Sequence, residues 1–466
     1  MNGRRVALTS LLLAAGCSAV DPQPAVDQVH TEVADRAAVA VDWDAEKQGH
    51  EAVGRYVAAR LDGELTADDA VAVSLLKNPT LRALYRELGV AQSDVVAAGL
   101  PENPVFSVER RFSGQAAEFD VAQEFISVFL IPLRRRMAES LFERERLRVT
   151  QEVIDHTAEV RTAYFRVQEA EQVVGLRRSV VQAMDGSREA ARALRAAGNT
   201  APLDVALAER GANRARLDLA DAELEVVEAR ERVNVLLGLW GEETRWRIPH
   251  RLPELPAADL PADELERRAV AGRLDLASLR AEIESLAQSL GLTRITSLLP
   301  ELTLGGHSER EPEGKTTRGP SLSFPISIFN RGQAARARAK YLLLQAGDRY
   351  AARAIEVRSD VRTAFARMET ARKKAEFYRR SVLPVQGVVT DQTLLRYNGM
   401  FVGVFDLLEA REEQINSARD YIHSLAEYWL ARTELEKVLG RRIPAGDLRP
   451  SSAGEPEPAP TTHHHK

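Results

Sequence analysis

Apolar side chains recur every seven residues in the first half of the chain, at Val153, Val160, Val167, Val174 and Val181. The corresponding positions of the second half are also apolar: Ala354, Val361, Met368, Ala375 and Val382. A strict repeat of this length stays against a neighbour only if the helices that carry it supercoil left-handedly. The pattern therefore predicts two long helices, each packed lengthwise against other helices.

These helices belong to an internal duplication. Glu159–Ala170 reads EVRTAYFRVQEA and Asp360–Ala371 reads DVRTAFARMETA, at an offset of 201 residues. A chain of 466 residues has room for two or three ordinary domains. The duplication instead favours one elongated body made of two similar halves.

Each half also contains segments in which apolar and polar residues alternate, the period that is typical of strands. They predict one β-hairpin over residues 104–130 and a second over residues 301–329. Within the second, residues 305–320 are rich in Gly, Glu and Pro and predict a loop. The apolar side chains expected to share a face are Phe119, Val121, Phe125, Phe129, Leu302, Leu304, Leu322, Phe324, Ile326 and Ile328.

Helix-capping residues, and Gly and Pro residues that end helices, predict where the remaining helices begin and end. A helix opened by Thr66 precedes the first β-hairpin, and long helical hairpins follow over residues 132–238 and 331–440. The first helix of the first helical hairpin, from Pro132 to about Ala197, spans about 100 Å at 1.5 Å per residue. The predicted organisation is a signal peptide at 1–16, a tether at 17–64 with one short helix, a first repeat at 65–240, a Pro-rich linker at 241–261, a second repeat at 262–442 and a disordered tail at 443–466.

The N-terminus has the three zones of an export signal: a basic start, a short apolar core and small residues before Cys17. The run LAAGC that ends at Cys17 resembles the lipobox of bacterial lipoproteins, although Leu13 lies one position earlier than is usual. The resemblance implies that Cys17 is lipidated, and simple cleavage of the signal is the alternative. By the same resemblance, Ser18 rather than an Asp after the cysteine permits delivery to the outer membrane.

Composition excludes several classes of function. The net charge of −5 provides no basic surplus for nucleic acid. Zinc-protease, phosphate-loop, dinucleotide and nucleophile-elbow motifs are absent from the sequence, so we expect no enzyme and no cofactor. The run His463–His465 either binds metal or is incidental, and we predict no metal site.

Strands with one apolar face, in an exported chain, favour a transmembrane β-barrel. An open sheet edge leaves backbone groups unpaired in hydrocarbon, and the smallest barrels of this kind have eight strands. Four strands cannot close alone. Oligomerisation is therefore expected, to eight strands in a dimer or twelve in a trimer.

Several motifs, in this duplicated order, resemble the TolC family of outer membrane factors. They are LPENP at 100–104, FNRGQAARA at 329–337, and the helical-hairpin turns at 198–204 and 399–406. The resemblance implies a homotrimer with a 12-stranded transmembrane β-barrel, four strands per chain, continued by a long periplasmic α-helical barrel. It also implies an outer membrane location and two partners, a periplasmic adaptor and an inner-membrane pump.

The same resemblance assigns candidate sites. The family narrows its tube with acidic side chains on the second hairpin, where Asp406 and Glu409 fall and share one helix face. The alternative is that both merely favour a helix N-terminus. We expect the second turn to be one residue longer than the first. The adaptor is expected to contact the turns, at Gly198, Asn199, Asp204, Gly399 and Gly403, unless these are ordinary connections between helices.

These observations favour a passive channel in a tripartite efflux system for small molecules or metal cations. A type I protein secretion conduit uses the same body. A periplasmic coiled-coil scaffold or adaptor lipoprotein without a pore is a third possibility, but it leaves the alternating strands unexplained. The sequence leaves the substrate open.

Overall fold

The computed structural model describes residues 20–110, 117–124, 126–257, 264–296, 302–311, 314–324, 328–329 and 331–443. The chain divides into two compact units, each described below by itself. Unit 1 takes its residues from Met1–Glu32, Arg82–Gln151 and Leu274–Glu356, and unit 2 from Val33–Leu81, Glu152–Arg273 and Val357–Lys466. Each unit thus draws on both halves of the duplicated sequence. Cys17, the signal peptide and the run His463–His465 lie outside the described residues.

The segment predicted as a tether is more helical than expected. It holds three helices, α2 (Gln23–Ala37), α3 (Trp43–Gln48) and α4 (His50–Leu61). In α2 every fourth residue is small, apolar and buried: Ala25, Val29, Val33 and Ala37. These positions share one helix face, so packing stabilises a segment whose sequence pattern is weak.

The helix predicted after Thr66 is confirmed but consists of two, α5 (Ala67–Lys77) and α6 (Pro79–Ala98). Thr66 caps α5, since its side-chain oxygen accepts a hydrogen bond from the Asp69 amide at 3.1 Å. The break falls at Asn78, whose ψ of 121° is extended. Pro79 causes it, because a proline disfavours the helical conformation in the residue before it. In the second half, too, two helices take the place of one, α9 (Leu265–Gly272) and α10 (Leu274–Thr296).

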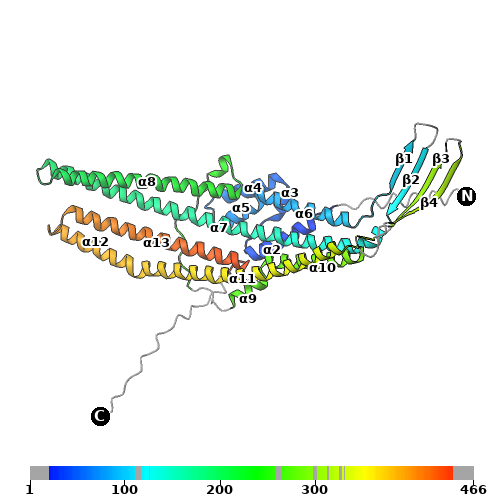
Figure 1. The fold of residues 1–466 in the computed structure, drawn as a ribbon. Coiled ribbons are helices and arrows are strands. Elements are labelled where there is room, and N and C mark those ends of the chain that lie inside the picture. Colours follow the sequence, from blue (N-terminus) through cyan, green and yellow to red (C-terminus); the bar gives the residue numbers. More distant parts are fainter. Residues whose placement is uncertain are drawn as a thin grey trace, which may run out of the picture. The chain divides into compact units, whose positions relative to one another are not determined.

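Unit 1 contains one antiparallel sheet of four strands in the order β1-β2-β3-β4. The strands are β1 (Val105–Arg110), β2 (Ala117–Glu124), β3 (Thr303–Arg310) and β4 (Thr316–Ser323) (Figure 1). Both predicted β-hairpins are confirmed. Pairing of β2 with β3 joins them into one sheet.

Two strand boundaries differ from the prediction. Strand β2 ends at Glu124 and a helix begins at Ile126, so Phe129 is helical rather than part of the sheet. The predicted loop at 305–320 is wrong, because most of it forms β3 and β4. Its Gly and polar residues have low strand propensity, but pairing of β3 with β2 and of β4 with β3 supplies their backbone hydrogen bonds. Ile326 and Phe125 lie outside the described residues.

Long helices make up most of the rest. The first pair is α7 (Ile126–Ala196) and α8 (Pro202–Leu237); the second is α11 (Gln333–Phe377), a π-helical turn (Tyr378–Val382), α12 (Leu383–Asn398) and α13 (Val404–Leu439). The predicted seven-residue repeat of buried apolar side chains is confirmed, since Val153, Val160 and Val167 are fully buried. Within the described residues, no helix has a stretch both long and apolar enough to cross a membrane.

The returning helices α8 and α13 end at matching glycines. Gly238 and Gly440 both take the left-handed conformation, with φ of 70° and 71°. Their amides bond back to the last turn, a helix ending that favours glycine because it has no Cβ. A 3₁₀ turn (Gly241–Thr244) follows the first of them.

Candidate functional site

The four-stranded sheet has two chemically different faces, set by strand register. On one face lie large apolar side chains, all exposed: Phe106, Val108, Phe119, Val121, Leu304 and Leu322. On the other face every ionisable side chain is acidic except one histidine: Glu109, Glu118, Asp120, Glu124, His307 and Glu309. Successive residues of a strand point to opposite faces, so the register assigns each side chain. Among the four described strands, no Lys or Arg falls on this acidic face.

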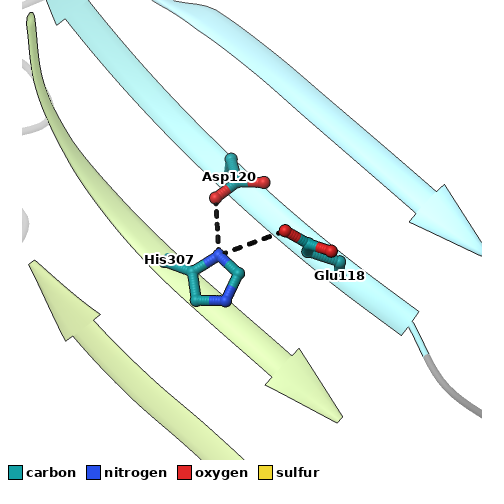
Figure 2. Close-up of side chains that lie close together, drawn as sticks. All are labelled: Glu118, Asp120 and His307. Atoms are coloured by element: carbon teal, nitrogen blue, oxygen red, sulfur yellow. Dashed lines mark hydrogen bonds and ion pairs between the residues drawn. The ribbon is translucent and has the colours of Figure 1, made fainter. Parts of the chain in front are cut away.

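The acidic face contains a close group of three side chains. His307 of β3 lies directly opposite Asp120 of β2, and its Nδ1 is 2.7 Å from the Asp120 carboxylate. The same nitrogen is 3.5 Å from the Glu118 carboxylate. Figure 2 shows both carboxylates directed at the imidazole. One ligand atom from each residue lies within 4.8 Å of the others.

The predicted adaptor-contact residues lie at the turns between the long helices. In the first turn Gly198 is left-handed, with φ of 79°, and the Asn199 amide bonds back to the Leu194 carbonyl at 2.8 Å. Asp204 closes the turn. Its carboxylate accepts hydrogen bonds from the Thr200 hydroxyl at 2.6 Å and the Ala201 amide at 3.1 Å. These bonds favour the charged form and lower the pKa of Asp204.

The second turn repeats this geometry, but at an offset of 202 rather than 201 residues. The left-handed residue is Met400, with φ of 62°, and the Phe401 amide bonds back to the Arg396 carbonyl at 2.9 Å. Gly399 is the last residue before it, and its φ of −82° is ordinary. Gly399 therefore does not correspond in structure to Gly198, although the two align in sequence.

The one additional residue that changes the offset from 201 to 202 lies before the second turn, in the π-helical turn Tyr378–Val382. A π-helix bonds each residue to the fifth along rather than the fourth, so one such turn absorbs one additional residue. Pro384 follows and favours such a distortion, because it has no amide hydrogen to donate. The expectation of a longer second turn is wrong, since both turns have the same length and bonding pattern.

The predicted gate residues are both exposed on α13. The Asp406 carboxylate accepts a hydrogen bond from the Gly403 amide at 2.7 Å, the position that Asp204 occupies in the first turn. Asp406 thus caps its helix, as the alternative interpretation expected. Glu409 lies one turn further along the helix. Their place in a gate stays a prediction.

The second turn also exposes apolar side chains that sequence reasoning did not single out. Met400 is 93% exposed and Phe401 is 83% exposed. The Phe401 ring lies over Gly399, where an added Cβ would come within 2.8 Å of it. A side chain at 399 would therefore displace the exposed Phe401 ring, whereas the backbone angle there is one that any residue adopts.

Comparison with known families gives the identity of the second half. Residues 265–441 match the family described as outer membrane efflux protein. This chain carries an outer membrane efflux protein domain. The resemblance inferred from the motifs is confirmed, and the efflux domain contains β3, β4 and the helices from α9 to α13.

One curated relative is similar over most of the chain. It is the cobalt-zinc-cadmium resistance protein CzcC of Cupriavidus metallidurans, 24% identical over 393 residues. The alignment covers 81% of this chain and 91% of the relative.

Solved structures show the same fold at low sequence identity. The Campylobacter jejuni CmeC outer membrane channel superimposes with a TM-score of 0.68 at 16% identity, over 83% of this chain and 86% of that one. The Neisseria gonorrhoeae MtrE outer membrane channel gives 0.64 at 19% identity, over 80% and 88%. The predicted fold class, mainly helical with a small sheet on the TolC plan, is confirmed.

Sequence reasoning missed the group of Glu118, Asp120 and His307 and predicted no metal site. These residues come from strands 187 residues apart, and His307 falls in the segment predicted as a loop. The available signal was the pair Glu118 and Asp120, acidic residues that alternate with Phe119 and Val121.

Proposed function

We propose that this protein is the outer membrane channel of a tripartite efflux system that exports divalent metal cations. The observation that carries the proposal is the two-faced sheet, with an exposed apolar face and an acidic one. An exposed apolar surface of this kind is suited to lipid. Carboxylates that line a channel raise the local concentration of cations and repel anions.

The open sheet calls for several copies of the chain. Strands β1 and β4 are its edges, and an unpaired edge is costly in hydrocarbon. Edge β4 of one copy pairing with β1 of the next would continue the sheet around a ring. Three copies give a barrel of 12 strands, within the range known for such barrels. A homotrimer is therefore the assembly that we propose, held in the outer membrane and anchored there by lipid on Cys17.

Metal cations are the favoured substrate for two reasons. The similar protein of C. metallidurans is named for resistance to cobalt, zinc and cadmium. The acidic face provides the matching charge, with five carboxylates, one histidine and no Lys or Arg in the described strands of each chain. A conduit for folded or unfolded proteins gains nothing from such a lining.

The turns at Gly198–Asp204 and Gly399–Asp406 are proposed to bind the periplasmic adaptor that connects the channel to an inner-membrane pump. The exposed Met400 and Phe401 would supply apolar contact there, and methionine and aromatic residues are enriched in interfaces. Asp406 and Glu409 would add negative charge near the entrance. A scaffold without a pore would leave the apolar face of the sheet in water.

Two measurements test the proposal. Full-length protein in planar bilayers under a salt gradient should conduct, and the sign of the reversal potential should show cation selectivity. Replacing the acidic-face residues Glu109, Glu118 and Glu309 by Gln should reduce that selectivity. Replacing Arg110, Arg310 and Arg318 of the opposite face by Gln is the matched control and should not. Absence of conductance, or equal selectivity in both variants, would contradict the proposal.

The substrate is tested in the bacterium that carries the gene. Deletion should increase sensitivity to zinc, cobalt or cadmium and raise their cellular content, and the wild-type gene should restore both. Unchanged metal resistance together with increased sensitivity to an organic drug would contradict metal export and indicate efflux of small organic molecules instead.

A further inference from the structure

His307 is surrounded by oxygen ligands on the acidic face of the sheet. Besides Asp120 and Glu118, which approach its Nδ1, the Glu309 carboxylate lies 3.9 Å from its Nε2. Three side chains of the group are partly exposed, so ions in solution have access to it. The group is thus open on the side away from the apolar face.

The donor set determines which ion would fit. One imidazole nitrogen with two carboxylates suits zinc and cobalt, whereas calcium and magnesium prefer six or more oxygens. In a tetrahedral zinc site with bonds of about 2.0–2.2 Å, neighbouring ligand atoms are separated by about 3.3 Å. The separations of 2.7 Å and 3.5 Å between Nδ1 and the two carboxylates lie on either side of that value. Small side-chain rotations would therefore bring the ligand atoms to the separations of a tetrahedral zinc site.

The neighbouring strands leave space above the group. In the same row across the sheet, Ser107 lies beside Asp120 and Gly319 lies beside His307. A Cβ added to Gly319 would meet no atom within 4 Å. An ion with a bound water thus has room, while the paired backbones of β2 and β3 fix the positions of its ligands.

We propose that Glu118, Asp120 and His307 bind one divalent cation of the zinc and cobalt class per chain. The proposal deepens the metal efflux function and rests on it for the origin of the ion. Three protein ligands leave a coordination position open, as in sites where the metal meets water or substrate. Such a site holds a cation loosely enough to exchange, which a conducting pathway requires.

A binding experiment on full-length protein in detergent tests the site. His463, His464 and His465 are first replaced by alanine, because a histidine run binds the same metals. Cobalt(II) is then added, its visible absorption is recorded, and displacement by zinc is followed. We expect one cobalt ion per chain, with a spectrum that reports nitrogen and oxygen ligands.

His307→Gln and Asp120→Asn should each weaken binding at least about 10-fold, since even the loss of an outer-shell partner typically costs 10- to 100-fold. The matched control is His423→Gln. His423 also contacts two carboxylates, Glu169 at 2.7 Å and Glu427 at 3.5 Å, but through opposite ring nitrogens, so they do not converge. This control should bind as the parent does.

A simple ion pair between His307 and Asp120 is the competing explanation. It predicts no cobalt spectrum, or the same spectrum in the parent and in His307→Gln, and either result overturns the site. Glu118→Gln provides a further variant if one of the others does not fold. Failure of the parent protein to bind cobalt, although it forms cation-selective pores, would overturn this inference alone. Intact binding without pores would overturn the proposed function alone.

Discussion

Gly238 and Gly440, at the ends of α8 and α13, provide a matched pair of positions for testing the packing of unit 2. Both are left-handed, with φ of 70° and 71°. A Cβ at Gly238 would lie 3.0 Å from the Pro79 ring and 3.1 Å from the Asn78 Cα. A Cβ at Gly440 would meet no atom closer than 3.6 Å, the end of a flexible arginine. Alanine therefore strains both backbones but collides at only one.

The expected magnitudes follow from these contacts. A left-handed alanine costs about 1–2 kcal/mol at either position. Overpacking adds about 1–3 kcal/mol at Gly238, because a proline ring and a backbone carbon are less able to move than a flexible side chain. Asn78 is also held in place, since its side-chain amide donates to the Leu236 carbonyl at 2.7 Å. Gly238→Ala should thus lose about 2–5 kcal/mol and Gly440→Ala about 1–2 kcal/mol.

Denaturant unfolding in detergent measures the difference. The transition is followed by far-UV circular dichroism and by tryptophan fluorescence, to which Trp246 contributes; it is buried after the end of α8 and donates to Asn234 at 2.8 Å. Equal losses of unfolding free energy in the two variants would refute the collision argument. Wild-type stability of Gly238→Ala would refute the assigned backbone conformation as well.

Three further predictions rest on single contacts. Burial lowers the pKa of His156, so the unfolded chain takes up a proton below about pH 6.5 that the folded chain does not, and stability should fall on acidification. His156→Gln should make that fall in stability shallower when the unfolding midpoint is plotted against pH. An unchanged slope of that plot would exclude His156 as the cause of the pH dependence. Thr66→Ala removes the acceptor of the Asp69 amide and should cost about 1 kcal/mol, whereas Thr66→Ser should restore most of it. Gly305→Val should abolish the proposed trimer, expected as a heat-sensitive band on gels, because an added Cβ would lie 2.6 Å from both the Ser321 hydroxyl and the Val121 carbonyl. Gly306→Val, with no atom within 4 Å, should leave it intact, and similar behaviour of the two would argue against the register of β3.

Local patterns were sufficient for much of the fold. The seam of Val153, Val160 and Val167 is buried as predicted, because a heptad repeat specifies both the helix and the face that it buries. Thr66 starts a helix and Gly238 ends one, since capping depends on the residue itself and its immediate neighbours. Alternation in the first β-hairpin placed Phe119 and Val121 on the apolar face.

Features that depend on pairing between distant segments could not be predicted from the sequence. Strands β3 and β4 are rich in glycine and polar residues, and they are strands because β3 pairs with β2 and β4 pairs with β3. The one-residue shift between the two helical turns was visible as an offset, but only the π-helical turn shows where the residue is absorbed. Gly399 aligns with Gly198 in sequence, yet Met400 takes its place in space.

The acidic group illustrates the same division. The amino-acid sequence by itself determined that Glu118 and Asp120 alternate with Phe119 and Val121, and that each β-hairpin has one apolar and one polar face. Only the tertiary structure decided that His307 lies opposite Asp120, across 187 residues of chain. The physical reason is that a shift of one residue in the pairing of β2 with β3 would turn every side chain of one strand to the other face. Register is a property of two strands together, and neither strand specifies it alone.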